Sequence, residues 1–301
     1  MLGLGLWLAG RFGDDAFELP EHRRTVACAV VGDLKSTIEE LWSLRAEIPR
    51  GDPDATEAVH AAIDLLDRGE ARVAEVVDGE VVVHEWLKQA ILLLFQLSSM
   101  TTTEAGPFEY HDKIPLKRDY ESLGVRVVPG GAARWGSYLA PGVILMPGYV
   151  NIGAHVGANT MVDTWATVGS CAQIGANVHL AGGVGIGGVL EPPQASPVII
   201  EDDCMIGSRC IVTQGARVGR GSVLAEATVL NPGIPVIDSV TGEEVSRGVV
   251  PPDCVVVRGD RLRSFPGGDF YLPCALILRR LSPGDRDHIN DVLREEGIYI
   301  S

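Results

Sequence analysis

The stretch "MVDTWATVGSCAQIGANVHL", Met161 to Leu180, repeats an aliphatic residue every six positions. Val162, Val168, Ile174 and Leu180 are the residues in step. A period of six matches neither the 3.6-residue period of an α-helix nor the strands of a hairpin. It is typical of a parallel β-helix, in which each unit is a short strand with a turn and three units form one triangular coil. The aliphatic residues should point into the resulting prism.

The same period extends to both sides of this stretch, with a slip of two residues across "LEPPQASPVI". The expected inward residues are Ile144, Val150, Val156, Val162, Val168, Ile174, Leu180 and Ile186, then Ile200, Ile206, Val212, Val218, Leu224, Leu230 and Val236. These units predict about five coils, stacked ~4.8 Å apart. Pro192 and Pro193 cannot donate to a strand ladder, so we expect their loop to leave the prism and reach a neighbouring subunit.

The flanking segments have a different character. Residues 33–68 carry apolar residues at helical spacings, and residues 71–97 predict two short strands around Asp78-Gly79 followed by a helix. Residues after 245 predict short strands and a closing helix. We therefore predict a mainly β protein in three parts: an α-rich N-terminal domain at 1–123, a parallel β-helix at 124–238, and a small β/α cap at 239–301.

Composition narrows the class of protein. A hydrophobic content of 46% with 22% charged residues is ordinary for a globular protein, and the net charge of -15 argues against nucleic acid or an anionic membrane as a partner. No apolar stretch approaches the ~20 residues of a membrane span. The opening "MLGLGLWLAGRF" lacks the flanking features of a signal peptide. The six cysteines contain no CxxC pair, which indicates reduced thiols in a cytoplasmic protein.

Two motifs, "MVDTWATVGSCAQIG" and "GGVGIGGVLEP", make the chain resemble the tetrahydrodipicolinate N-succinyltransferases over roughly residues 55–300. The resemblance implies a left-handed β-helix and a homotrimer with active sites between neighbouring subunits. It also implies transfer of succinyl from succinyl-CoA to the amine of L-2-amino-6-oxopimelate, in lysine and diaminopimelate biosynthesis. Succinyl-CoA would be a co-substrate, with no cofactor and no metal.

Two substrate-contacting positions of the family fall on matching motifs here, Arg126 in "RVVP" and Asp163 in "MVDTW". A third departs from the pattern. Many members have a glutamate four residues after the glycine of "IGxR", where this chain has Ile211. The departure puts a two-carboxylate mechanism in doubt and leaves acetyl-CoA as an alternative donor.

The chemistry agrees with a single carboxylate. A thioester is already activated, so transfer to an amine requires alignment, a proton acceptor and a donor for the oxyanion, but no serine or cysteine nucleophile. Asp163 follows an inward valine and should lie on the outer face of the prism. We expect Arg126, and also Arg209, to bind the acidic substrates. For Arg134, Lys113 and Lys117 the sequence favours solvated surface charges.

Other signals have plainer interpretations. "GGVGIGG" is in phase with the repeat and precedes no helix, so we interpret it as tight turns rather than a phosphate loop. Cys171 has no activating neighbour in the sequence and is expected to pack. His155 and His179 suggest a zinc enzyme like the β-helix carbonic anhydrases, but their spacing places them on adjacent faces and a third histidine is missing. A non-catalytic scaffold is the remaining alternative.

Overall fold

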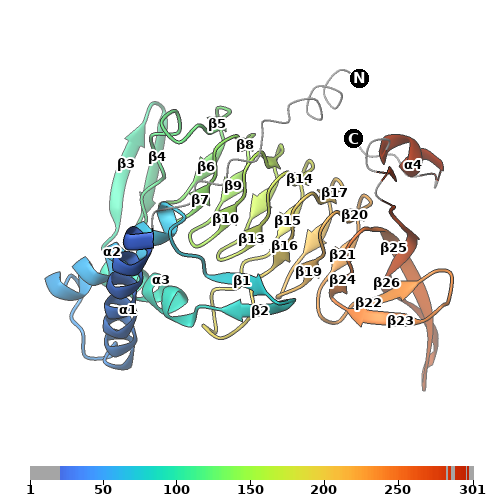
Figure 1. Cartoon of the computed structure of the whole chain (residues 1–301), viewed down its shortest axis with the longest axis horizontal. Helices are drawn as coiled ribbons and strands as arrows, with labels where there is room; N and C mark the ends of the chain where they lie inside the picture. The colour runs from blue at the N-terminus through green and yellow to red at the C-terminus, as the bar shows by residue number, and fades with distance from the viewer. Residues whose placement is uncertain (1–20, 283, 286–288, 296, 298–301) are drawn as a thin grey trace.

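The computed structural model describes residues 21–282, 284–285, 289–295 and 297 (Figure 1). The interpretation of the first twelve residues as something other than a signal peptide falls outside this range. Among the described helices, none has the length and apolar character needed to cross a membrane.

Three parallel sheets of short strands form the sides of a triangular prism (Figure 1). Side one contains β5 (Arg126–Val127), β8 (Ile144–Leu145), β11 (Met161–Val162), β14 (His179–Leu180), β17 (Met205–Ile206) and β20 (Val223–Leu224). Side two contains β6 (Ala132–Ala133), β9 (Tyr149–Val150), β12 (Thr167–Val168), β15 (Gly185–Ile186), β18 (Ile211–Val212) and β21 (Val229–Leu230). Side three contains β7 (Tyr138–Leu139), β10 (His155–Val156), β13 (Gln173–Ile174), β16 (Ile199–Ile200), β19 (Arg217–Val218) and β24 (Val249–Val250). The chain visits the three sides in turn, which confirms the predicted fold class.

The core of the prism is built from the second residue of these strands. Val162, Val168 and Ile174 are fully buried, as the six-residue period predicts. The prediction for Ile144 was wrong, because Leu145 is the buried residue of β8 and Ile144 is only partly buried. The unit between Leu145 and Val150 is one residue short, so counting back in sixes arrives at the wrong residue.

The prism is also longer than expected. Sides two and three have six rungs each, where the sequence predicted about five. The extra coil lies before residue 144, where Ala133 and Leu139 are buried core residues. The start of the repeat is hard to recognise in the sequence for two reasons. The core residue Ala133 is small, and the unit from Leu145 to Val150 is one residue short.

A long loop joins β15 to β16. Its Pro192 and Ala195 carbonyls accept hydrogen bonds from Lys88 Nζ at 3.2 and 2.7 Å. Lys88 is fully buried, and it belongs to a helix of the same chain. The loop leaves the prism as predicted, but it packs against its own chain. Contact with a neighbouring subunit stays a prediction.

The N-terminal elements cover one flank of the prism (Figure 1). They are α1 (Glu21–Ser43), α2 (Pro53–Asp67), β1 (Ala74–Val77), β2 (Glu80–Val83), α3 (Glu85–Leu97), β3 (Thr101–Ala105) and β4 (Phe108–Asp112). Asp52 caps α2 by accepting a hydrogen bond from Ala55 N at 2.9 Å. The helices and the β1–β2 hairpin were predicted, whereas the β3–β4 hairpin was not. Ile63 of α2 and Ile91 of α3 share one apolar cluster with Ile152 and Cys171, which lie at the corner between sides two and three.

The C-terminal elements cover the far end. They are β22 (Pro235–Asp238), β23 (Glu244–Arg247), β25 (Cys254–Phe265), β26 (Gly268–Arg280) and α4 (Ile289–Glu295). The first residues of β25 extend side one, and Val255 packs with Val223 and with Leu293 of α4. The prediction of short strands was wrong for β25 and β26, which form a long antiparallel ribbon. Apart from one register shift between Val255 and Val256, the pairing continues to the tight turn at Pro266-Gly267.

Candidate active site

Asp163 lies at the corner between sides one and two, directly after β11. Its side chain is 28% exposed and lies on the outer surface of the prism. Oδ1 accepts hydrogen bonds from Thr164 N at 2.6 Å and from Thr164 Oγ1 at 3.2 Å. These two bonds fix the orientation of the carboxylate and leave Oδ2 directed elsewhere.

His179 is the neighbour of Oδ2. Its Nε2 lies 3.4 Å from Asp163 Oδ2, and the imidazole is only 11% exposed. The contact follows from the coil length, because Met161 pairs with His179 on the next rung and Asp163 is two residues beyond Met161. From the sequence, His179 was considered only as a candidate metal ligand, not as a partner of Asp163. The eighteen-residue coil was the signal that could have placed it beside Asp163.

The same corner carries a column of residues in left-handed backbone conformation. Trp165, Gly183 and Arg209 occupy equivalent turns on successive rungs, with φ of 61°, 69° and 62°. A Cβ on Gly183 would come within 2.8 Å of Arg209 Cδ and Nε, so the Arg209 side chain lies across that glycine. The glycine therefore lets Arg209 reach toward the rung of Asp163. Trp165 is 70% exposed on that rung.

The basic residues considered from the sequence fall into two groups. Lys117 Nζ forms an ion pair with Asp67 Oδ1 at 2.7 Å, and its side chain is only 3% exposed. Arg134 Nη2 donates to Asp112 Oδ2 at 2.7 Å. The prediction of solvated charges was wrong for these two residues, because α2 and β4 bring carboxylates to them.

Lys113 also has a local partner, since its Nζ donates to the Phe95 carbonyl at 2.5 Å. Arg126 and Arg209 differ from these residues. Neither side chain forms an ion pair within the described part of the chain, and both are exposed. Arg126 is on side one, two rungs from β11, or ~10 Å along the prism. Both are free to bind an anionic ligand near Asp163.

Ile211 is the first residue of β18 on side two, where it pairs with Gly185. Its side chain is 47% exposed. Position 211 is thus on the open surface, on the side of the prism that begins at the Asp163 corner. The resemblance places a glutamate at this position, but this chain presents an apolar isoleucine side chain there.

Cys171 is fully buried at the corner between sides two and three. Burial raises the pKa of its thiol to about 12, which disfavours the reactive thiolate. The expectation that Cys171 packs is confirmed. Cys204, Cys210, Cys254 and Cys274 are likewise buried and free of disulfides. The side chain of Cys28 lies outside the described part.

The two histidines weighed as zinc ligands lie on different sides, His155 on side three and His179 on side one. Within the described residues no three His, Cys, Asp or Glu side chains are grouped closely enough to hold a metal ion. The chemistry of the corner is that of a hydrogen-bonded carboxylate–imidazole pair with arginines nearby. Such a pair can accept a proton from an amine without a metal.

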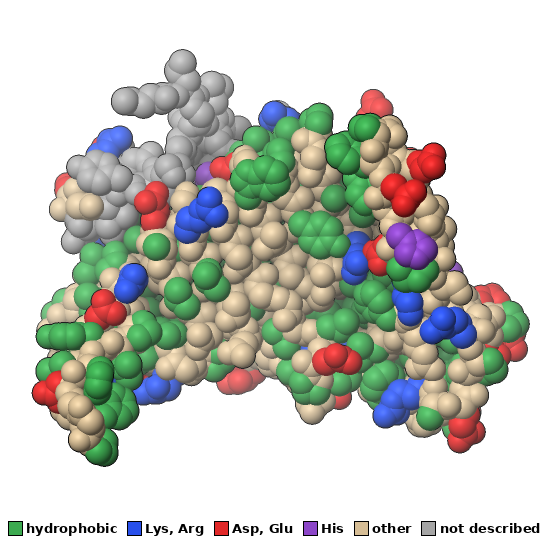
Figure 2. Space-filling view, turned by 180° about the vertical axis from the view of Figure 1, so that it is seen from behind, with side chains coloured by type: hydrophobic (Ala, Val, Ile, Leu, Met, Phe, Trp, Pro, Cys, Tyr) green, Lys and Arg blue, Asp and Glu red, His purple; other side chains and the backbone are tan. Residues whose placement is uncertain are grey.

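Charged side chains are unevenly distributed over the surface of the molecule. The middle of the face seen from behind is occupied largely by backbone and uncharged side chains, and most charged side chains lie toward the two ends (Figure 2). On side two the outward residues Thr167, Ile211 and Val229 are uncharged and exposed. A surface of this kind can be covered by a partner without burying unpaired charge.

Two family profiles match parts of this chain, and several curated relatives that match most of it carry the same name. The profile described as tetrahydrodipicolinate N-succinyltransferase N-terminal matches residues 33–97, and that of the hexapeptide repeat of succinyl-transferase matches residues 197–231. A 2,3,4,5-tetrahydropyridine-2,6-dicarboxylate N-succinyltransferase from Dechloromonas aromatica is 46% identical, over 87% of this chain and 98% of its own. The Caulobacter vibrioides enzyme of the same name is 47% identical, over 88% of this chain and 100% of its own.

Among solved structures, a Campylobacter jejuni protein described as a 2,3,4,5-tetrahydropyridine-2-carboxylate N-succinyltransferase is 18% identical. The match covers 73% of this chain and 62% of that one, with a TM-score of 0.41. The sequence relatives, rather than this likeness of fold, show the family.

Proposed function

This chain belongs to the tetrahydrodipicolinate N-succinyltransferase family, and from that premise we propose that it transfers the succinyl group of succinyl-CoA to the amine of L-2-amino-6-oxopimelate. Membership makes it an acyl-CoA-dependent N-acyltransferase. The observation that carries the detailed proposal is the Asp163–His179 pair on an open corner, with Arg209 reaching toward the same rung.

The reaction forms one C–N bond and breaks one C–S bond. The neutral amine attacks the thioester carbonyl, and the tetrahedral intermediate collapses with expulsion of the CoA thiolate. The amine nitrogen loses a proton and the thiolate gains one, so that an amide and free CoA result. A base beside the amine assists the attack, because it removes the positive charge that develops on nitrogen.

We assign Asp163 as that base. Thr164 fixes one of its oxygens, and His179 lies against the other at 3.4 Å. In this assignment His179 is a positioning residue, which keeps the carboxylate aimed and stabilises its charge. In this assignment the Asp163–His179 pair accepts the proton from the amine without a second carboxylate. The resemblance places such a carboxylate at the position that is Ile211 in this chain.

Arg126 and Arg209 are proposed to bind the acidic ends of the substrates. Both lack ion-pair partners within the described chain, whereas Arg134 and Lys117 are committed to carboxylates of the fold. An arginine fork matches the two oxygens of a carboxylate. This observation favours a succinyl donor, which ends in a carboxylate.

Acetyl-CoA is the second candidate donor, and one observation favours it. The exposed Ile211 offers an apolar contact where a charged group would otherwise stand. An apolar wall suits a methyl group better than it suits a charged succinyl tail. The two donors therefore require different contacts on this surface: succinyl requires a cation for its carboxylate, and acetyl requires an apolar contact for its methyl group.

We further propose a homotrimer with active sites between subunits. Uncharged exposed residues on side two support this, and so do the apolar side chains Phe265, Phe270 and Tyr271 exposed on the β25–β26 ribbon. A second subunit over side two would shield Asp163 from water, which strengthens its electrostatic interactions. The division at 123 and 238 and a cytoplasmic location complete the proposal, with β24 and the first residues of β25 closing the prism from the C-terminal part.

A donor comparison tests the proposal. Succinyl-CoA and acetyl-CoA are each incubated with L-2-amino-6-oxopimelate and the full chain, and free thiol is measured. We expect faster release with succinyl-CoA, and about a 100-fold lower kcat in Asp163→Asn. Asp33→Asn, at an exposed position of α1, is the control that should keep full activity. Thiol release that is equal in Asp163→Asn and wild type would make the aspartate structural, and release with neither donor would indicate a scaffold.

A further inference from the structure

A cavity of about 350 Å³ lies between the β1–β2 hairpin and side three of the prism. Its polar and charged lining consists of Arg72, Glu75, Gln173, Glu201, Asp202 and Arg220. Ile199 and Val76 add apolar surface. A volume of this size accepts a small molecule rather than a nucleotide cofactor.

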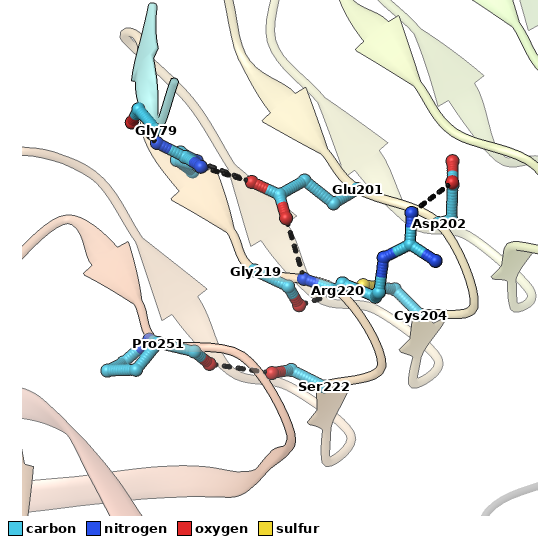
Figure 3. A network of polar contacts seen from close by, with 9 residues as sticks. Gly79, Glu201, Asp202, Cys204, Gly219, Arg220, Ser222 and Pro251 are labelled. Carbon is cyan, nitrogen blue, oxygen red and sulfur yellow. Dashed lines mark hydrogen bonds and ion pairs between the residues drawn. The ribbon is translucent and has the colours of Figure 1, made fainter. Parts of the chain in front are cut away.

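Most charges around this cavity are already paired. Glu201 Oε1 accepts from Arg217 Nε at 2.6 Å, and Glu201 Oε2 accepts from Arg220 N at 2.9 Å (Figure 3). Asp202 Oδ2 accepts from Arg220 Nη2 at 2.8 Å. Arg217 Nη1 also donates to the Gly79 carbonyl at 2.6 Å, which fastens the hairpin turn to side three. The acidic wall is thus held rigidly in place.

Glu75, on the hairpin side of the cavity, is also paired, since His84 Nε2 lies 2.8 Å from its Oε1. Arg72 is different. Its Nε donates to Gln173 Oε1 at 3.1 Å, but in the described part of the chain no carboxylate lies within ion-pair distance of its guanidinium. Burial lowers the pKa of Arg72, and the carboxylates of Glu75 and Asp202, which lie beyond ion-pair distance, offset this only in part. Direct contact between the guanidinium and an anion is therefore left for a ligand.

The remaining lining limits which anion fits. A guanidinium fork matches a carboxylate, whose two oxygens accept parallel hydrogen bonds. Glu75, Glu201 and Asp202 would repel a multiply charged anion such as a phosphate, and they would attract an ammonium group. We propose that the cavity binds a small amino-acid zwitterion, with its carboxylate on Arg72 and its ammonium group toward the acidic wall.

This position is separate from the proposed transfer site. Gln173 and Ile199 belong to side three, whereas Asp163 lies at the corner of the other two sides. A ligand here would touch both the hairpin and the prism, and would stabilise their contact. Ligand that binds only the folded state raises the melting temperature. Binding is thus measurable without any acyl donor, so the outcome does not depend on the proposed reaction.

A matched five-carbon series tests the charge requirement. L-norvaline carries both groups, glutarate carries only carboxylates, and cadaverine carries only amines. We expect calorimetric titration of the full wild-type chain to show binding of L-norvaline, with glutarate and cadaverine weaker by about tenfold or more. Absence of L-norvaline binding at tens of millimolar, or equal binding of all three, would overturn the proposal.

Variants place the ligand. Arg72→Met should weaken L-norvaline about tenfold or more, while Arg68→Met, in an exposed pair four residues away, should bind as wild type. Asp163→Asn should also bind as wild type. Loss in Asp163→Asn with retention in Arg72→Met would put the ligand in the transfer site and refute the proposal. Should Arg72→Met not fold, Arg72→Lys keeps the charge without the fork and should bind more weakly; unchanged affinity there would count against the geometry.

Discussion

Trp165 and Cys171 occupy equivalent turns of consecutive units, yet they meet different surroundings. Both have left-handed backbone, with φ of 61° and 67°. Trp165 is among the most exposed aromatic residues described, whereas Cys171 is completely buried against Ile91 of α3. The repeat therefore gives these corners the same backbone conformation, but it does not set the role of the side chain. What lies over the corner decides whether it becomes core or a candidate site.

The contrast extends to charged residues. Toward the covered flank, Lys117 and Arg134 are paired with carboxylates from N-terminal elements. At the open corner, Arg209 has no such partner within the described chain. We infer that substitutions on the covered flank should act on stability, and substitutions at the open corner on substrate binding.

The largest stability effect is expected for Lys117→Met. The ammonium group is buried beside Asp67, which also accepts a hydrogen bond from Gly136 N, so its removal leaves a partly buried carboxylate without its cation. We expect a loss of about 3 kcal/mol in the free energy of unfolding. Denaturant titration measures it, and kcat of the folded fraction should not change.

Lys35→Met is the matched control. Lys35 and Glu39 form an exposed pair at 3.8 Å along α1, and its loss should cost less than ~0.5 kcal/mol. Equal stability of the two variants would contradict the distinction between a covered and an open flank. It would mean that Asp67 is satisfied without Lys117.

The sequence was informative where the repeat alone decides the structure. The position of Asp163 on the outer surface follows from the inward Val162 before it. The Asp163–His179 contact was also within reach, because one coil is eighteen residues. The partners of Lys117 and Arg134 were not, since they come from helices and hairpins whose docking has no period. The same holds for Arg72, whose cavity exists only because the hairpin lies over side three.

A second prediction concerns the pH dependence of the free energy of unfolding, which we attribute in part to the buried histidine His155. His155 is on side three, where its ring contacts that of Tyr138 with centroids 4.7 Å apart and planes tilted by 37°. Burial, with a smaller contribution from Arg72, lowers its pKa to about 3. The unfolded chain takes up a proton near the ordinary histidine pKa of ~6.5, and the folded chain does not. Stability is therefore full above pH ~6.5 and falls as the pH decreases toward 3.

At pH 5 the expected loss from this one group is about 2 kcal/mol. The measurement is the free energy of unfolding at pH 7 and pH 5 for wild type and for His155→Leu. Carboxylates contribute similarly to both proteins, so the difference between them isolates the histidine. A pH dependence that is the same in both would show that His155 stays hydrated in the folded protein.

The smallest effect is expected at the open corner, from Arg209→Met. Its side chain crosses Gly183 without an ion pair to any described residue, so the free energy of unfolding should change by less than ~0.5 kcal/mol. If Arg209 binds a substrate anion equally in the ground state and the transition state, KM should rise about tenfold with kcat unchanged. Steady-state kinetics with succinyl-CoA varied measures this, and Arg50→Met, at an exposed position between α1 and α2, is the control. An Arg209→Met protein that loses stability but keeps its KM would reverse the comparison, because the open corner would then be structural.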